Sequence, residues 1–261
     1  SVNNYGKILN FKNGDIKFKN VSFKYPETNI YALKNINFTI SSGNTLGIVG
    51  RTGSGKSTIL ELISRSYDVT SGKIYLDDKT LSSYNLQSLK SFISYVPQNP
   101  FLFSDTIIEN IKFGNYTARN DEVVKVAKDS SIHSDISRFK DKYETPLGER
   151  GVNLSGGQIQ RITIARALLK RSKILILDDC LSSVDTKTES KILSNIKKTK
   201  KKETVIIVSN KISSVMHADL IIVLDKGIII EKGTHKQLLS IKGYYEKLVE
   251  KQVDNIEFIK F

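Results

Sequence analysis

The feature that most constrains the fold is a glycine-rich loop between a strand pattern and a helix pattern. The apolar stretch 46–49 leads into the loop, and the apolar residues of 59–63 recur at helical spacing after it. The loop consists of Gly50, Arg51, Thr52, Gly53, Ser54, Gly55, Lys56, Ser57 and Thr58. This context predicts a phosphate-binding loop, because glycines let backbone N–H groups converge on phosphate oxygens.

Two side chains of this loop have specific predicted roles. We expect Lys56 to reach the β- and γ-phosphates of a nucleotide, and the Ser57 hydroxyl to ligate Mg²⁺. The N-terminus of the following helix adds positive potential where the anion lies. The alternative for the same pattern is a glycine-rich turn that binds no ligand.

A second anion-binding surface is predicted at 154–158, where the sequence is Leu-Ser-Gly-Gly-Gln. An amphipathic run follows, so this segment is expected to form a Ser- and Gly-rich helix N-terminus. Its candidate ligand-binding residues are Ser155, Gly156, Gly157 and Gln158.

With these two motifs the chain resembles the ATP-binding cassette (ABC) family, whose signature motif is LSGGQ, over about residues 15–250. Further matches in the family's order are Phe23-Lys24-Tyr25-Pro26, Pro97-Gln98, the segments 148–151 and 174–179, and Ser183-Val184-Asp185. The resemblance implies ATP and Mg²⁺ as cofactors. Its implied metal ligands are Ser57, Gln98 and Asp178, with Asp178 acting through the water shell of the ion.

The resemblance also suggests roles for residues around these motifs. Tyr25 is expected to stack on adenine, or else to be a core aromatic residue, and Gln98 is expected to sense Mg²⁺ and the γ-phosphate. The apolar segment 99–103 either joins the core or receives a coupling helix from a transmembrane partner. Glu149 and Arg150 match a cross-contact loop particular to exporters, or are solvated loop charges.

Two positions depart from the family pattern. The family normally has Glu where this chain has Asp179, and His where it has Asn210 within the stretch 205–215. The histidines of the chain are His133, His217 and His235. None of them can replace Asn210 without a shift of register. Asp is one methylene shorter than Glu, and Asn cannot shuttle a proton, so slow hydrolysis is predicted; the alternative is a site that still hydrolyses usefully.

The residues expected to contact a nucleotide bound by a partner cassette match the family pattern. Ser155 and Gly157 can donate to a γ-phosphate across an interface, and Asp185 matches the loop that touches the opposing P-loop. The candidate catalytic residues are Lys56, Gln98, Asp179 and Asn210. This combination resembles the less active member of bacterial heterodimeric multidrug exporters, or the N-terminal cassette of a fused transporter, and predicts a different, Glu-bearing partner subunit.

Composition limits the location and the class of partner. No stretch approaches the about 18 consecutive apolar residues of a membrane span, and the single Cys180 excludes an intramolecular disulfide framework. We therefore expect a soluble domain in a cytosolic, reducing location, and the resemblance to exporters implies the cytoplasmic face of a membrane. The net charge of +13 is diffuse, and its densest cluster, 197–202, is expected to be a solvated loop rather than a membrane- or nucleic-acid-binding patch.

The strand and helix patterns predict an α/β fold, namely a P-loop NTPase core with a mostly parallel sheet, an N-terminal antiparallel β subdomain and an inserted helical subdomain. Antiparallel strands are predicted at 15–23 and 32–40, further strands at 73–76 and 93–96, and the helical insertion at about 103–172. Buried parallel strands are predicted at 174–177, 205–208 and 220–224, a hairpin turn at 225–227 leading to 228–231, and helices at 187–198, 234–241 and 244–252. The expected organisation is a linker at 1–14, one nucleotide-binding domain at 15–252, and a tail at 253–261.

Two other functional classes remain as alternatives. One is a DNA-associated ATPase of the same superfamily, which the basic composition favours. Segment 148–151 and the absence of a coiled-coil arm between the two motifs argue against it, and no nucleic-acid partner is expected. The other is a non-catalytic regulatory module that binds ATP only to hold a complex together.

Overall fold

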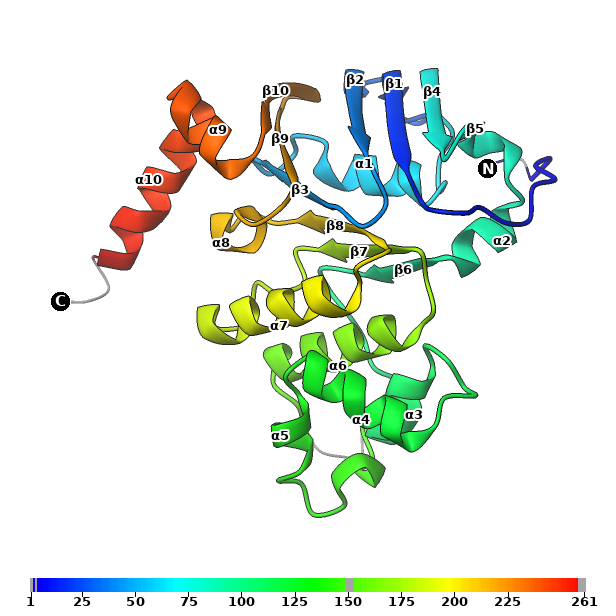
Figure 1. Ribbon diagram of the computed structural model, residues 1–261, viewed down its shortest axis with the longest axis vertical. Coiled ribbons are helices and arrows are strands. Elements are labelled where there is room, and N and C mark those ends of the chain that lie inside the picture. The colour runs from blue at the N-terminus through cyan, green and yellow to red at the C-terminus, as the bar shows by residue number, and fades with distance from the viewer. Residues whose placement is uncertain (1, 3, 149–152, 258–261) are drawn as a thin grey trace.

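The computed structural model describes residues 2, 4–148 and 153–257, which form two β-sheets and a helical lobe (Figure 1). An antiparallel sheet has the strand order β2-β1-β4-β5, with β1 at Ile16–Lys24, β2 at Tyr31–Ile40, β4 at Ser71–Leu76 and β5 at Lys79–Thr80. A six-stranded sheet has the order β10-β9-β3-β8-β7-β6, and its members pair in parallel except for β10 with β9. Its strands are β3 at Thr45–Gly50, β6 at Ile93–Val96, β7 at Ile174–Asp178, β8 at Thr204–Val208, β9 at Leu220–Asp225 and β10 at Ile228–Gly233. The predicted fold class is confirmed.

The parallel strands are buried on both faces, which explains their near-continuous apolar sequences. In β7, Leu175 and Leu177 face the core on the helical side, while Ile174 and Ile176 face the core shared with the antiparallel sheet. Helix α1 (Lys56–Ile63) lies between the two sheets, with its apolar side chains in that second core (Figure 1). The P-loop is therefore fixed at both ends, by a buried strand and by a buried helix.

The helical insertion lies between β6 and β7 in the sequence and forms the far lobe of the molecule (Figure 1). Its helices are α3 (Ile107–Lys112), α4 (Asn120–Asp129), α5 (His133–Ile136) and α6 (Gly156–Leu169), with a 3₁₀ turn at Lys142–Glu144. Helix α6 packs under the six-stranded sheet together with α7 (Thr186–Thr199) and α8 (Ile212–Val215). The N-terminus of α6 thus belongs to the helical insertion.

Several elements were not predicted or extend beyond the predicted limits. Helix α2 (Leu86–Ser91) and a 3₁₀ turn at Leu81–Ser83 lie between β5 and β6. Helix α9 spans His235–Ile241, and α10 spans Tyr244–Glu257, five residues past the end of the periodic pattern at 252. None of the helices in the described part of the chain has the length and apolar character needed to cross a bilayer.

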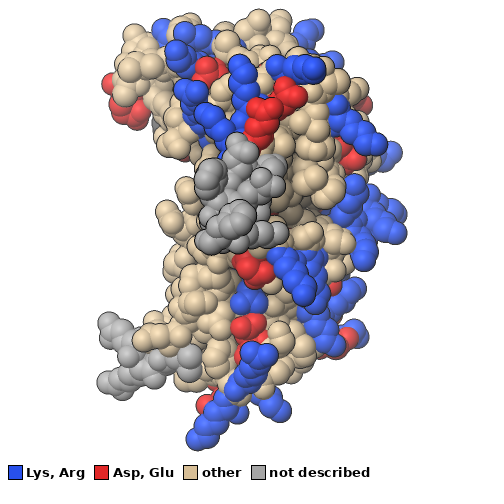
Figure 2. Space-filling model, turned by 90° about the vertical axis from the view of Figure 1, so that its left-hand side faces the viewer, with Lys and Arg blue, Asp and Glu red and all other residues tan. Residues whose placement is uncertain are grey.

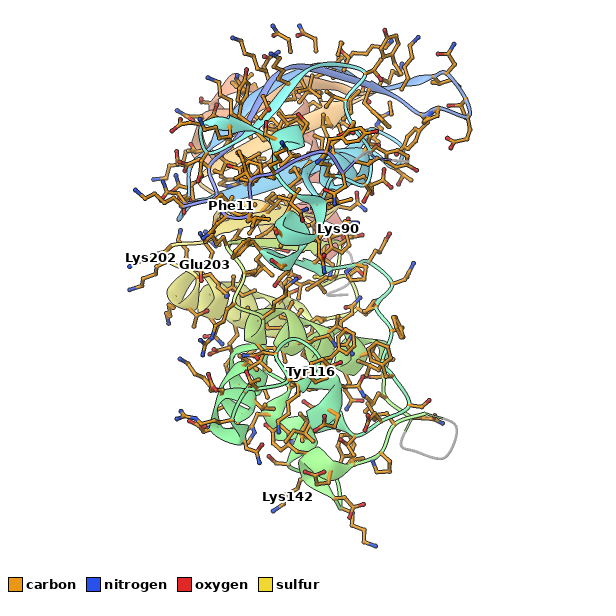
Figure 3. The ribbon with its side chains drawn as sticks, turned by 90° about the vertical axis from the view of Figure 1, so that its right-hand side faces the viewer. Phe11, Lys90, Tyr116, Lys142, Lys202 and Glu203 are labelled. Carbon is orange, nitrogen blue, oxygen red and sulfur yellow. The ribbon has the colours of Figure 1, made fainter. Side chains whose placement is uncertain are left out.

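The segment expected to be a linker contacts the domain through several of its described residues. Phe11, labelled in Figure 3, is only 4% exposed. Its ring packs edge-on against Tyr84 and Phe92. Nearer the N-terminus, the Asn4 side-chain oxygen accepts a hydrogen bond of 2.7 Å from the backbone N–H of Leu86. Residues 4–14 therefore run over the surface of the domain and insert one aromatic ring into its core.

Candidate functional site

Many of the predicted site residues meet at the carboxyl ends of the parallel strands, around a cavity of about 480 Å³. The predicted residues in its lining are Tyr25, Thr52, Gly53, Gly55, Lys56, Ser57, Thr58, Gln98, Asp178, Asp179 and Asn210. Residues in the lining that the sequence did not predict are Ile30, Tyr31, Ala32, Val208, Lys226 and Gly227. These residues come from the start of β2, the end of β8 and the β9–β10 turn. Because these segments are far apart in the sequence, only the tertiary structure shows that they share one cavity.

The P-loop wraps around the ammonium group of Lys56. Lys56 Nζ donates to the backbone oxygens of Gly50 at 2.7 Å and Arg51 at 2.9 Å. Burial lowers the pKa of Lys56, and the nearby carboxylates of Asp179 and Asp178 oppose this shift. The cation is thus oriented by the loop and turned toward the acidic side of the cavity.

The space enclosed by the loop fits a phosphate group. At Gly53, where φ is +78°, an added Cβ would meet no atom of the described chain within 4 Å. Within the described residues, the buried hydroxyl of Ser54 has no hydrogen-bond partner. The loop therefore offers open space beside a cation, as a phosphate cradle requires.

Asp178, the last residue of β7, is tied to the neighbouring strand. Tyr95 of β6 donates its hydroxyl to Asp178 Oδ2 at 2.7 Å. Burial raises the pKa of Asp178; Asp179 adds to the rise, while the Tyr95 hydrogen bond and Lys56 oppose it. Tyr95 was not predicted, because it reaches Asp178 only through the parallel pairing of β6 with β7.

The donor set around Asp178 fits Mg²⁺ bound to phosphates. No cluster of three or more His, Cys, Asp or Glu side chains that could cage a metal occurs among the described residues. Mg²⁺ does not need such a cage, since it keeps several waters and uses one or two carboxylates beside phosphate oxygens. Ser57, Gln98 and Asp178 line one cavity and could supply these few ligands.

The second acidic residue, Asp179, is the centre of a hydrogen-bond cluster. Its Oδ2 accepts from Gln98 Nε2 at 3.2 Å and from Asn210 Nδ2 at 3.4 Å, and its Oδ1 accepts from Ser209 Oγ at 3.4 Å. Its φ of +45° lies in the left-handed region, which Asp tolerates better than most residues. The fold thus joins three predicted residues from separate strand ends, and adds Ser209, which was not predicted.

Tyr25 lines the cavity and also packs on aromatic neighbours. Its hydroxyl bonds Glu61 Oε2 at 2.7 Å and Thr58 Oγ1 at 2.9 Å, and its ring lies edge-on to Phe23 and Tyr67. Burial raises the pKa of Tyr25 to about 12. The ring is therefore held rigidly at the cavity wall, as a stacking platform needs to be.

The signature residues Ser155 to Gln158 and the later Asp185 do not line this cavity. Ser155 caps α6 by accepting from the backbone N–H of Gln158 at 3.3 Å, and Gln158 Oε1 accepts from the backbone N–H of Ser155 at 2.9 Å. Asp185 caps α7 by accepting from the backbone N–H of Thr188 at 3.0 Å. A Cβ on Gly157 would lie 2.9 Å from the backbone oxygen of Ser183, so only glycine fits that approach. Glu149 and Arg150 lie outside the described residues.

Comparison with known proteins identifies the family. The model of the family described as ABC transporter matches residues 33–182, more than half of the chain. The chain belongs to the ABC transporter family. It is 46% identical over 247 residues to the uncharacterized ABC transporter ATP-binding protein YfiB of Bacillus subtilis (strain 168), covering 95% of this chain and 43% of YfiB.

Two further comparisons are with a probable multidrug resistance transporter and with an exporter. The chain is 45% identical over 239 residues to the probable multidrug resistance ABC transporter ATP-binding/permease protein YheI of Bacillus subtilis (strain 168), covering 92% of this chain and 41% of YheI. It superposes with a TM-score of 0.90 on a bacterial Atm1-family ABC exporter with ATP bound, at 36% identity, covering 97% of this chain and 44% of the exporter chain. This ABC domain thus spans less than half the length of these relatives.

The signature of this ABC domain is held by a pH-sensitive contact. Asp135 Oδ2 accepts from Arg161 Nη1 at 2.8 Å, and its Oδ1 accepts from Gln158 Nε2 at 3.3 Å. Burial alone would raise the pKa of Asp135, but the hydrogen bonds from Arg161 and Gln158 and the Arg161 charge lower it. Folding therefore stabilises the ionised carboxylate.

Replacing Asp135 with Asn is expected to lower the unfolding free energy by about 1 kcal/mol at pH 7. Because the folded pKa is depressed, this stabilisation is complete above the unfolded value of about 3.9 and is lost as the pH falls through the lower folded value. Urea unfolding of the unmodified chain and of Asp135→Asn over a pH series measures this difference in unfolding free energy. A difference that stays constant down to the most acidic pH would contradict this linkage.

Proposed function

We propose that this chain is the ATP-binding domain of an exporter, that its own site hydrolyses ATP slowly, and that its signature completes the site of a second, Glu-bearing cassette. The cluster around Asp179 carries this proposal. The intact P-loop beside it supports binding of ATP, whereas the short carboxylate and the neutral Asn210 do not support rapid turnover.

For binding, the loop amides and Lys56 would hold the phosphates, while Ser57, Gln98 and Asp178 would hold Mg²⁺. Mg²⁺, when bound, neutralises charge on the phosphate oxygens. Tyr25 would stack on the adenine ring at the other end of the cavity. Each of these residues faces one continuous space, which suits a single extended nucleotide.

Slow turnover follows from the groups next to the expected position of the attacking water. Asp179 has the acid of Glu but a side chain one methylene shorter, and both of its oxygens already accept hydrogen bonds from the protein. Asn210 can donate a hydrogen bond but cannot carry a proton. A displacement of about 1 Å at such a position can cost about a hundredfold in rate.

Assembly with a second cassette is supported by the signature, which is formed but lies outside this chain's own cavity. Helix α6 has 14 residues, Ser155 and Gly156 at its start are exposed, and the helix N-terminus offers positive potential to an anion. Asp185 lies on the neighbouring α7 cap and would meet the opposing P-loop.

Coupling to a transmembrane partner is supported by a second cavity of about 480 Å³ between β6 and α6. Its lining includes Pro100, Phe101, Phe113 and Arg166. Phe101 is 64% exposed, so the segment 99–103 does not lie wholly in the core. We infer that a coupling helix inserts here and holds the domain at the cytoplasmic face of a membrane.

The basic charge does not favour a nucleic-acid partner over this assignment. On the face shown in Figure 2, Lys and Arg side chains extend from the β-sheet lobe to the helical lobe, with Asp and Glu side chains among them. A nucleic-acid site would concentrate them along one groove.

A complementation assay tests the proposal with this chain alone. One component is the unmodified chain. The other carries Asp179→Glu, Asn210→His and Ser155→Asp, so that its active site is repaired while its signature repels phosphate. Asp retains the capping function of Ser155, so α6 remains intact. We expect slow hydrolysis by each component and at least about tenfold faster hydrolysis by the mixture, since the signature of the unmodified chain completes the repaired site.

The matched control adds Ser155→Asp to the unmodified chain, which removes the only working signature from the mixture. Stimulation should then disappear. If the first mixture hydrolyses ATP no faster than its components, trans completion is wrong, and ATP binding without hydrolysis would favour a regulatory module that holds a complex together.

A further inference from the structure

The C-terminal helix α10 contacts the nucleotide site from outside the cavity. It packs against α8 and α9 (Figure 1). Its start is fixed, because the Glu231 carboxylate accepts from the backbone N–H groups of Tyr244 and Tyr245, and the fully buried Tyr245 bonds His235 Nδ1 at 2.9 Å. Tyr244, Leu248 and Gln252 follow at four-residue spacing and so share one face of the helix.

The first residue of this face holds the P-loop. Arg51 Nε donates to the hydroxyl of Tyr244 at 2.9 Å, and the guanidinium carbon lies 5.6 Å from the centre of the Tyr244 ring. The backbone oxygen of Arg51 is itself one of the two acceptors for Lys56 Nζ. Tyr244 thus anchors the side chain of a residue whose backbone orients the phosphate-binding ammonium group.

The last residue of this face holds the segment that carries Asn210. Gln252 Nε2 donates to the backbone oxygen of Asn210 at 2.8 Å, and Gln252 Oε1 accepts from the backbone N–H of Ile212 at 2.9 Å. Ile212 begins α8, whose N-cap Lys211 provides no side-chain cap. The first amides of a helix have no partner within it, so Gln252 supplies one from another helix.

The same segment is also held by residues of the β7–α7 connection and of α7. Lys211 Nζ donates to the backbone oxygen of Ser182 at 3.2 Å and pairs with the buried Glu189 at 3.6 Å. Gln252 is therefore the α10 part of a clamp on this segment. The clamped residue Asn210 is the one whose amide reaches Asp179 at 3.4 Å.

We propose that α10 positions the nucleotide site, with Gln252 holding Asn210 within reach of Asp179 and Tyr244 holding Arg51 beside the loop around Lys56. Both are positioning residues, because neither lines the nucleotide cavity. The proposal rests on the function proposed above for its kinetic consequences, but its structural part is independent of ATP.

Hydrogen exchange of the nucleotide-free protein tests the structural part. Gln252→Ala removes the acceptor of the Ile212 amide, so exchange within 209–213 is expected to accelerate about tenfold. Gln252→Glu keeps an acceptor for that amide and should largely restore its protection. Lys251→Ala, at an exposed neighbour on the same helix, should change nothing. The peptide containing Tyr245 reports whether α10 stays folded.

Steady-state ATP hydrolysis tests the consequence for the site. Gln252→Ala should lower kcat about tenfold with little change in KM, because Asn210 and Asp179 act on water. Tyr244→Phe, which loses only the hydroxyl, should instead raise KM several-fold, because Arg51 and Lys56 belong to the phosphate-binding loop.

Unchanged exchange at 209–213 in Gln252→Ala, with α10 still protected, would overturn the proposal. Acceleration spread evenly over the domain would also overturn it, because Gln252 would then stabilise the fold as a whole. Absence of ATP hydrolysis by the unmodified chain would count against the proposed function, while the exchange result would still decide the role of Gln252.

Discussion

Replacing Asp179 with Glu and Asn210 with His is expected to raise ATP turnover by this domain about a hundredfold. The longer side chain moves the carboxylate about one bond length further from the backbone, and His restores a group that can carry a proton. The present cluster cannot compensate for the short side chain of Asp179. Gln98, Asn210 and Ser209 donate to the Asp179 oxygens where these now lie, at 3.2 to 3.4 Å.

Steady-state hydrolysis by the double variant, both single variants and the unmodified chain measures this gain. Asp179→Asn with Asn210→His serves as the control, because it has the restored His but no carboxylate, and it should remain slow. Glu tolerates the φ of +45° less well than Asp, so a small loss of thermal stability should accompany the gain. Equal rates for the double variant and the unmodified chain would place the rate limit elsewhere.

Replacing Gly50 with Ala is expected to lower the unfolding free energy by about 3 kcal/mol or more. A Cβ at this position would lie 2.3 Å from the backbone oxygen of Leu224 and 2.7 Å from Ser54 Oγ. The first neighbour belongs to β9, which pairs with β3 in register, so relief would require the central strands to separate. ATP binding should be lost with the structure of the loop.

Gly53→Ala is the matched control within the same loop. Its Cβ would meet no described atom within 4 Å, so only the φ of +78° opposes it, at about 1–2 kcal/mol. The variant should fold, yet bind ATP weakly because its methyl group enters the space expected to hold phosphate. Urea unfolding and titration with a fluorescent ATP analogue separate the two effects. Equal loss of stability in both variants would contradict the packing argument.

The local motifs were predictable because their conformations depend on neighbouring residues. The P-loop requires glycine at particular backbone angles, and the start of α6 requires a capping residue followed by Gln at the right spacing, which Ser155 and Gln158 provide. Successive side chains of β7 face two different cores, and this burial likewise follows from a short apolar run. These features need no knowledge of distant parts of the chain.

Contacts between distant segments could not be predicted in this way. Tyr95 reaches Asp178 because β6 pairs with β7, and Gln252 reaches Asn210 because α10 lies against α8. Neither residue belongs to a motif with a characteristic spacing, so nothing local marks it.

By itself, the sequence therefore determined the α/β class, and it predicted two anion-binding motifs and an impaired site at Asp179 and Asn210. The tertiary structure decided which residues surround the cavity and that the signature lies outside it. The physical reason is that backbone angles and caps are set over a few residues, whereas the order β10-β9-β3-β8-β7-β6 results from burying side chains from the whole chain in two shared cores.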